Sequence, residues 1–337
     1  MEKIRWGIIG AGGIADRRGI PALMLDPRNE IAAMMDRVPE VSEAIAQKYG
    51  VRQYFTDVET MLKTVGCDAV YIATPVCCHY EQAMLALKYG VHVFVEKPLA
   101  MNSTEGQKLV DAFRSAGLQL TVGYMMGYHN LHCKARELIR EGQLGNLNLV
   151  RMQFSCWYPD IPGAWRQNRA LSGGGCIMDL AVHCMELFHS ITADQIADCK
   201  AFFSTKTFSY EVEDNASILF RSEKGVIGHI DVNFNIPDDA AASKLEIYGT
   251  TGSIFAEGTL GQEETGSLKF VYAPQGNYEA QQSRKVNDPQ MFYGVGDNIY
   301  LKQFTVFNQL MRTTPDYSNA EQAVRIQQLC DKIYQEN

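Results

Sequence analysis

The 337-residue sequence contains no long apolar run and no cluster of basic residues. No segment approaches the roughly 20 apolar residues that a membrane-spanning helix needs, and the first residues lack the apolar region of a signal peptide. The formal net charge of −8 argues against a nucleic-acid partner, because binding that polyanion requires a concentrated basic surface. These absences predict a cytoplasmic protein that binds neither a membrane nor a nucleic acid.

The nine cysteines include no CxxC pair. An odd number of cysteines in a chain that is long enough to bury a core predicts reduced thiols that serve as packing groups. Cys77 and Cys78 are adjacent, but two consecutive residues seldom reach a common metal ion or form an ordinary disulfide. We therefore expect no disulfide framework.

The length predicts two domains, because chains of this size usually divide into more than one core. Residues 1–122 alternate short apolar runs with helical patterns, which is typical of a doubly wound parallel α/β sheet. Residues 123–337 begin with a helical pattern and continue as β-rich runs joined by the hairpin signals SEKG and GTTG. This second domain is predicted to be α+β, with a large, mainly antiparallel open sheet. Two helices, over residues 298–311 and 319–334, are expected to close the chain.

An open sheet face often meets a second copy of itself, so the second domain also predicts a homodimer or homotetramer.

A glycine-rich turn follows the first expected strand and opens a helix. Gly10, Gly12 and Ala15 give the pattern G-x-G-x-x-A, whose other residues include Gly13 and Ile14. Gly10 permits the tight turn, Gly12 lets the backbone approach a pyrophosphate, and Ala15 allows close helix packing. The helix N-terminus would then favour the phosphates. The alternative is a glycine turn with a purely structural purpose.

Asp36 ends the second expected strand, 21 residues beyond Ala15. An acid at this position can bind the adenosine ribose hydroxyls, and together with the glycine turn it predicts a dinucleotide site. Because a carboxylate repels a 2′-phosphate, NAD is favoured over NADP. The adjacent Arg37 could pair with that phosphate or stack on adenine, so NADP stays open as the alternative.

Glu96, Lys97 and Pro98 lie at the carboxyl end of the fifth expected strand, on the edge where open parallel sheets bind their ligands. A partly desolvated lysine beside a nicotinamide can share a proton with a substrate hydroxyl. The structural alternative is a solvated lysine before a turn proline.

The run Ser172-Gly173-Gly174-Gly175 precedes a helical pattern that carries Asp179 and His183. These two residues are spaced i and i+4, so on an α-helix they share one face and can address one ligand. Histidine exchanges protons near neutral pH, and the aspartate can orient it. A structural hydrogen-bonded pair is one alternative. A metal site with Cys176 is another, but no second Cys/His group with ligand spacing completes it, and no metal is predicted.

Three segments in this order resemble the Gfo/Idh/MocA family of oxidoreductases: GAGGIA after the first strand, EKP after the fifth, and WRQNRALSGGGCIMDLAVH before the sheet domain. The resemblance implies that Lys97, Asp179 and His183 are catalytic and converge on the substrate hydroxyl beside the nicotinamide. These three residues would also bind the substrate, and Trp165 and Arg166 match the family's WR pair, which would shape the sugar pocket. The structural alternative for that pair is a rim aromatic and a surface cation. Tyr124 is a further candidate for the pocket because it lies just after the sixth expected strand. Thr74, Pro75 and His79 resemble the family's TPNxxH turn near the cofactor, although Val76 replaces its asparagine, and Glu96 and Lys97 would also border the cofactor.

The resemblance implies hydride transfer between NAD(P) and a ring secondary alcohol, or its ketone, of a sugar, glycoside or cyclitol. Two alternatives remain at this point. One is reduction of a dicarbonyl or dihydrodiol-type substrate, and the other is a non-catalytic NAD(P)-sensing regulatory protein.

Overall fold

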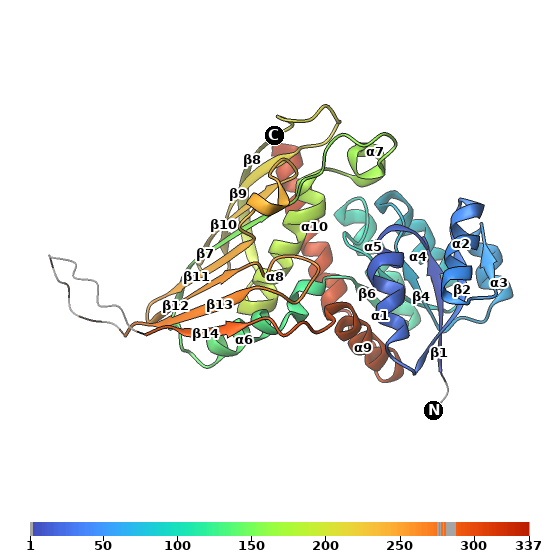
Figure 1. Ribbon diagram of the computed structural model, residues 1–337, viewed down its shortest axis with the longest axis horizontal. Coiled ribbons are helices and arrows are strands. Elements are labelled where there is room, and N and C mark those ends of the chain that lie inside the picture. Colours follow the sequence, from blue (N-terminus) through green and yellow to red (C-terminus); the bar gives the residue numbers. More distant parts are fainter. Residues whose placement is uncertain (1–2, 275, 277, 279, 281–287, 337) are drawn as a thin grey trace. The chain divides into compact units, whose positions relative to one another are not determined.

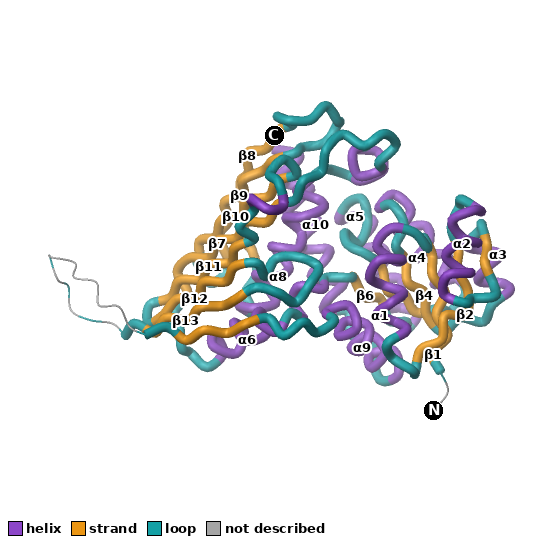
Figure 2. The backbone as a smooth tube through the Cα atoms, in the orientation of Figure 1, coloured by secondary structure: helices purple, strands orange, loops and turns teal. Residues whose placement is uncertain are grey.

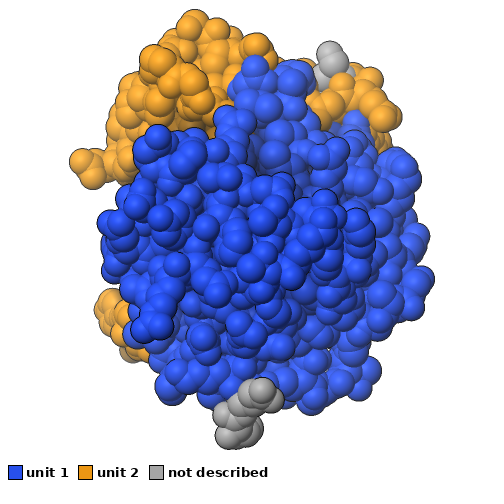
Figure 3. All heavy atoms as spheres, turned by 90° about the vertical axis from the view of Figure 1, so that its right-hand side faces the viewer, with its two compact units in different colours: residues 1–124, 168–173, 300–331 blue, residues 125–167, 174–299, 332–337 orange. Residues whose placement is uncertain are grey.

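The computed structural model describes residues 3–274, 276, 278, 280 and 288–336 (Figure 1). The chain forms two compact units, which Figure 3 colours separately. The first unit contains residues 1–124, 168–173 and 300–331, and the second contains residues 125–167, 174–299 and 332–337. Both units are therefore discontinuous in sequence, whereas the predicted functional division at residues 122 and 123 is a single cut and stays a prediction.

The first unit is built on a six-stranded parallel sheet in the order β3-β2-β1-β4-β5-β6. All four residues of β4 are buried, as expected for a parallel strand that is covered on both faces. The doubly wound sheet predicted from the alternating apolar runs is confirmed. The strands are β1 (Ile4–Ile9), β2 (Asn29–Met35), β3 (Tyr54–Phe55), β4 (Ala69–Ile72), β5 (His92–Val95) and β6 (Leu120–Val122).

Short polar side chains and glycines set the ends of the helices in this unit. The Asp57 carboxylate accepts a hydrogen bond from the backbone N–H of Thr60, and Asn102 caps the next long helix in the same way. Gly50 and Gly117 end two helices in the left-handed conformation. Besides the two C-terminal helices described below, the helical elements of this unit are η1 (Ala15–Gly19), α1 (Ile20–Met24), α2 (Pro39–Tyr49), α3 (Val58–Thr64), η2 (Val76–Cys78), α4 (His79–Lys88), α5 (Ser103–Ala116) and α7 (Arg169–Ser172).

An aromatic cluster fixes helix α9 (Ile299–Arg312) against the parallel sheet. Phe304 and Phe307 of α9 lie 5.7 and 5.2 Å from Trp6 of β1, measured between ring centroids. Phe304 also contacts Phe94 of β5, at 4.6 Å, and Tyr71 of β4, at 5.3 Å. Removing one such buried ring typically costs about 3–5 kcal/mol, so this cluster is a main source of stability for the first unit.

The second unit contains an eight-stranded sheet in the order β14-β13-β12-β11-β7-β10-β9-β8 (Figure 2). Every strand pair is antiparallel except β10 with β7. The predicted mainly antiparallel sheet is confirmed, and both hairpin signals lie at turns, one between β9 and β10 and the other between β11 and β12. The strands are β7 (Leu147–Ser155), β8 (Ile196–Ser204), β9 (Asn215–Ser222), β10 (Ile227–Asn233), β11 (Lys244–Gly249), β12 (Gly252–Glu257), β13 (Ser267–Tyr272) and β14 (Gln290–Tyr293).

Helices cover one face of this sheet. Figure 1 shows α6 and α8 along that face, and Phe188 of α8 contacts Phe220 of β9 at 4.9 Å. Residues of β9 alternate between buried and more exposed, as expected when one face is covered. The remaining helical elements of the chain are η3 (Met125–Tyr128), α6 (Asn130–Arg140), η4 (Trp165–Gln167), η5 (Ile177–Ala181), α8 (Val182–Thr192), η6 (Asp238–Ala240) and α10 (Ser318–Glu336).

Both predicted C-terminal helices are present as α9 and α10, each shifted by one or two residues from the predicted bounds. No helix in the described part of the chain is both long enough and apolar enough to cross a membrane.

Candidate active site

The glycine turn after β1 lies against the end of β4. Gly10 has a φ of +84°, and a Cβ atom there would lie 2.8 Å from Thr74 Cγ2 and 2.9 Å from the backbone of Ala73. Both the conformation and the space therefore require glycine. Gly13 also has a positive φ, of +55°, and helical backbone runs from residue 13 to residue 24.

Two backbone hydrogen bonds tie the glycine turn to the end of β2. The N–H groups of Gly10 and Ala11 donate to the carbonyl oxygen of Met35, at 2.8 and 3.2 Å. The next residue is Asp36, whose Oδ1 accepts a hydrogen bond of 3.1 Å from the N–H of Val38. The structure thus brings together the turn and the acid that the sequence predicted, with Asp36 half-buried and Arg37 exposed.

His79 joins two loops at the carboxyl edge of the parallel sheet. Its imidazole is buried, with Nδ1 2.9 Å from the carbonyl oxygen of Pro98 and Nε2 3.0 Å from that of Thr74. Burial lowers the pKa of His79. The predicted cofactor role of Thr74, Pro75 and His79 stays a prediction, and the observed contacts of His79 are to the protein backbone.

Glu96 and Lys97 follow β5 at the same edge. The Glu96 side chain is buried, and its Oε1 accepts a hydrogen bond of 2.5 Å from the Tyr71 hydroxyl. Burial and the nearby Glu96 carboxylate raise the pKa of Tyr71, so its hydroxyl remains a donor. Lys97 is half-buried. The sequence did not predict a role for Tyr71, because Tyr71 lies within the buried apolar strand β4 and no motif distinguishes it from its neighbours.

In the second unit, tight packing around two glycines positions the turn before α8. A Cβ atom on Gly174 would lie 2.0 Å from the Tyr334 hydroxyl oxygen, and one on Gly175 would lie 2.0 Å from the carbonyl oxygen of Glu213. The Oε1 atom of Glu213 accepts hydrogen bonds from the N–H groups of Gly175 and Ile177, at 2.9 and 3.0 Å, and from the Tyr334 hydroxyl, at 2.7 Å. Both glycines are therefore required for this packing, and Glu213 anchors the turn.

The helical turn that carries Asp179 is wider than the sequence predicted, and His183 follows it on α8. Residues Ile177–Ala181 form a π-helical turn, which continues as α8, and such turns occur frequently at functional sites. Asp179 Oδ1 lies 3.5 Å from Nε of Arg166, whose guanidinium stacks 4.2 Å from the centre of the Trp165 ring. His183 is buried, with its ring 6.4 Å from that of Phe154.

These contacts bring together four of the residues predicted from the sequence: Trp165 stacks on Arg166, Arg166 pairs with Asp179, and the turn bearing Asp179 continues into the helix bearing His183. Tyr124, another predicted substrate residue, is buried at the end of the first unit's N-terminal segment. The predicted substrate roles of all these residues stay predictions.

Comparison with known proteins identifies the family. A model described as an oxidoreductase family with an NAD-binding Rossmann fold matches residues 4–124, and a model of the GFO/IDH/MocA C-terminal domain matches residues 132–255. The chain belongs to the Gfo/Idh/MocA family. It is 31% identical to a 1,5-anhydro-D-fructose reductase of Ensifer adhaerens over 265 residues, which cover 78% of this chain and 79% of that protein.

Two further proteins match over nearly the whole chain. A D-glucoside 3-dehydrogenase of Escherichia coli K12 is 26% identical and covers 99% of this chain and 95% of its own length. The crystal structure of an aldose–aldose oxidoreductase from Caulobacter crescentus, complexed with glycerol, has a TM-score of 0.86 at 20% identity and covers 99% and 97% of the two chains. Family membership makes this chain an NAD(P)-dependent oxidoreductase, and its first domain is the family's NAD-binding Rossmann domain.

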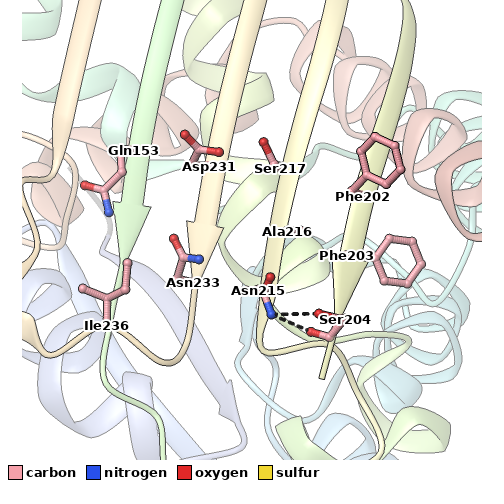
Figure 4. Close-up of a pocket in the computed structure, with 10 residues that line it drawn as sticks. All are labelled: Gln153, Phe202, Phe203, Ser204, Asn215, Ala216, Ser217, Asp231, Asn233 and Ile236. Atoms are coloured by element: carbon pink, nitrogen blue, oxygen red, sulfur yellow. Dashed lines mark hydrogen bonds between the residues drawn. The ribbon is translucent and has the colours of Figure 1, made fainter. Parts of the chain in front are cut away.

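A separate hollow of about 430 Å³ lies on the other face of the antiparallel sheet (Figure 4). Polar side chains from neighbouring strands point into it, and Asn215 donates a hydrogen bond of 3.0 Å to the carbonyl oxygen of Ser204. None of the site residues predicted from the sequence contributes to it. Its lining consists of Gln153, Phe202, Phe203, Ser204, Asn215, Ala216, Ser217, Asp231, Asn233 and Ile236.

Proposed function

We propose that the chain transfers a hydride between C4 of the nicotinamide and a ring secondary alcohol, or the matching ketone, of a sugar, glycoside or cyclitol. The observation that carries this proposal is the ion pair between Arg166 and Asp179. Asp179 lies on the turn that leads into the helix with His183. The named activities of the matched relatives, an anhydrofructose reductase and a glucoside 3-dehydrogenase, support the substrate class.

The Asp179 side chain is 23% exposed and that of Arg166 is 32% exposed, so both retain access to solvent and to a ligand. At 3.5 Å their contact is longer than a strong charge-assisted hydrogen bond, and hydroxyl groups can exchange with it at little cost. A carboxylate accepts hydrogen bonds from hydroxyls and a guanidinium donates them. We therefore assign this pair to binding of the ring hydroxyls.

His183 takes the proton from the reacting hydroxyl in our proposal, because imidazole exchanges protons near neutral pH. Lys97 polarises the same oxygen and helps to relay the proton. The hydrogen bond that the Tyr71 hydroxyl donates to Glu96 supports this role indirectly, because it holds the residue immediately before Lys97. When bound, the dinucleotide supplies the hydride acceptor or donor.

NAD is the cofactor we propose. Asp36 follows Met35, whose carbonyl oxygen accepts the hydrogen bonds from the glycine turn. A carboxylate at this position binds the ribose hydroxyls of NAD and repels the 2′-phosphate of NADP. Titration of cofactor fluorescence with NADH and NADPH tests this preference. Tighter binding of NADPH would contradict it.

The proposed reaction is tested by incubating the protein with NAD and NADP and a panel of aldoses, glycosides and cyclitols, and following absorbance of the reduced cofactor. On the best substrate, His183→Ala and Lys97→Ala should each lower kcat by about 10²- to 10⁴-fold. Lys108→Ala, which changes an exposed lysine on α5, is the control and should keep full activity. Near-complete activity in both catalytic variants would overturn the assignment, as would cofactor binding without turnover of any substrate.

We also propose that the enzyme is cytoplasmic and that it is a homodimer or homotetramer that pairs through the exposed face of the antiparallel sheet. Phe202 is 88% exposed, Leu219 56% and Ile227 43%, and these apolar groups lie on neighbouring strands among charges of both signs, such as Arg151 and Asp231. A face of this composition can pair with itself about a two-fold axis. Light scattering should give a multiple of 37.7 kDa for the wild-type chain. A wild-type monomer would exclude the interface.

A further inference from the structure

Cys77 and Cys78 lie close enough for their sulfur atoms to act together, in contrast to the expectation for consecutive residues. Their Sγ atoms are 3.7 Å apart on the short turn η2. Both side chains are half-exposed and neither is in a disulfide. The proximity of the two sulfur atoms depends on the conformation of this turn, which the sequence alone could not predict.

The separation of the sulfur atoms fits a bridging atom better than a direct bond. A disulfide needs its sulfurs about 2.05 Å apart and its Cα atoms usually about 4.4–6.8 Å apart, whereas consecutive Cα atoms are only about 3.8 Å apart across a trans peptide. An atom with bonds of about 2.3 Å to each sulfur, at an angle near 100°, holds the two sulfurs about 3.5 Å apart. The observed backbone therefore needs little change to chelate such an atom.

The chemistry of Cys78 also disfavours oxidation. Burial raises the pKa of the Cys78 thiol to about 11, so the thiolate that would attack peroxide is scarce near neutral pH. The two thiols can instead condense with an electrophile that carries hydroxyl groups. This reaction releases water and leaves the oxidation state of both sulfur atoms unchanged.

The turn that carries the two thiols belongs to the dinucleotide side of the first unit. Thr74, three residues before Cys77, packs directly against Gly10 of the glycine turn. Arg37, the residue after Asp36, lies close enough to Cys78 to act on its charge. His79, immediately after the pair, holds the loop that ends at Pro98. The two sulfurs thus lie beside both landmarks of the dinucleotide site.

We infer that Cys77 and Cys78 form a chelating dithiol for a trivalent thiophilic metalloid, and that its occupation competes with the dinucleotide. With a monosubstituted arsenical, R–As(OH)₂, two S–As bonds form and two As–OH bonds break. The two hydroxyl groups leave with the two thiol protons as water, and arsenic stays trivalent. The competition with the dinucleotide rests on the proposed cofactor site along Gly10 and Asp36. The chelation of the metalloid by Cys77 and Cys78 is independent of that site.

Phenylarsine oxide is the probe, and mass spectrometry of the intact protein is the first readout. The wild-type protein should retain one phenylarsenic group in excess 2-mercaptoethanol and lose it to 1,2-ethanedithiol. Peptide mapping should place the group on the segment with Cys77 and Cys78. Cys77→Ser and Cys78→Ser should each retain the probe at least about 10²-fold more weakly, because a single bond replaces a chelate. Cys133→Ser, which changes an exposed single cysteine, is the matched control and should behave as the wild type.

Retention at another cysteine would overturn the chelating site, as would retention as strong as that of the wild type in Cys77→Ser or Cys78→Ser. Mapping on the wild-type protein decides this even if a variant folds poorly. Saturating NADH should slow labelling of the wild-type protein at least about tenfold. Unchanged labelling in the presence of NADH that is bound, as shown by its fluorescence, would overturn the competition and leave the chelation and the proposed reaction to their own tests.

Discussion

Substituting Tyr334 by phenylalanine tests whether the network around Glu213 positions the turn with Asp179. The change removes only the hydroxyl that donates a 2.7 Å hydrogen bond to the buried Glu213 carboxylate. The ring can keep its edge contact with Phe203, at 5.6 Å between centroids. The variant therefore removes the polar contact with Glu213 and keeps the aromatic ring.

The expected magnitude follows from the partners of Glu213. Its Oε1 accepts three hydrogen bonds, and the variant leaves the two from Gly175 and Ile177. A hydrogen bond to a charged group contributes about 1.5–3 kcal/mol, so the free energy of unfolding should fall by about 2 kcal/mol. Because displacement of a catalytic group by about 1 Å can cost about 100-fold in rate, kcat should fall about 10- to 100-fold. The Kd for NADH should not change, since the dinucleotide turn has no part in this network.

The pH dependence supplies a second signature. Burial raises the pKa of Glu213 above its ordinary value of 4.5, so the folded protein binds this proton more tightly than the unfolded chain. The contribution of Glu213 to stability therefore falls as pH rises from 4.5 through the raised pKa. The Tyr334 hydroxyl lowers that pKa, so Tyr334→Phe should be more destabilising at pH 8 than at pH 5.

Urea denaturation at both pH values and steady-state kinetics measure these effects, and Tyr293→Phe, with a 65% exposed ring, is the control. A variant that loses stability but keeps the wild-type kcat would refute the positioning of Asp179 by this network. Unchanged stability at both pH values would refute the energetic argument itself.

Three further predictions concern other parts of the chain. Tyr71→Phe should lower the free energy of unfolding by about 1–3 kcal/mol, because it leaves the buried Glu96 without its 2.5 Å donor, and urea denaturation measures this. Asp36→Ala should weaken NADH binding about tenfold and shift the preference towards NADPH, which fluorescence titration checks; an unchanged preference would count against the assigned ribose contact. Burial lowers the pKa of His132 to about 3 from its ordinary 6.5, so wild-type stability should fall by up to about 1.4 kcal/mol per pH unit below pH 6.5. In His132→Gln this slope should be smaller, and an equal slope in urea denaturation would contradict the role of His132.

Much of the architecture followed from local patterns. The parallel sheet was predicted because short apolar runs alternate with helical patterns over residues 1–122, and the two closing helices because their apolar residues recur at helical spacing. Strand β14 was not predicted, because its residues are mostly exposed and carry no strong alternating pattern.

The supports of the candidate site were less predictable. The glycine turn, Asp36 and the EKP segment were found because chemistry fixes their spacing along the chain. Glu213 and Tyr334 are 121 residues apart and meet only in the folded protein, so no local signal identifies them. The π-helical turn at Ile177–Ala181 was also not predicted, since it depends on the same packing around the glycines.

The central claim is hydride transfer to or from a ring carbon, and isotope transfer tests it most directly. NADH that carries deuterium at the transferred C4 position should be incubated with the ketone form of the best panel substrate, and the product analysed by mass spectrometry and NMR. The account predicts one deuterium on the newly formed ring carbinol carbon, and a strongly reduced rate of its appearance in His183→Ala. Product formation without deuterium at that carbon would contradict the claim.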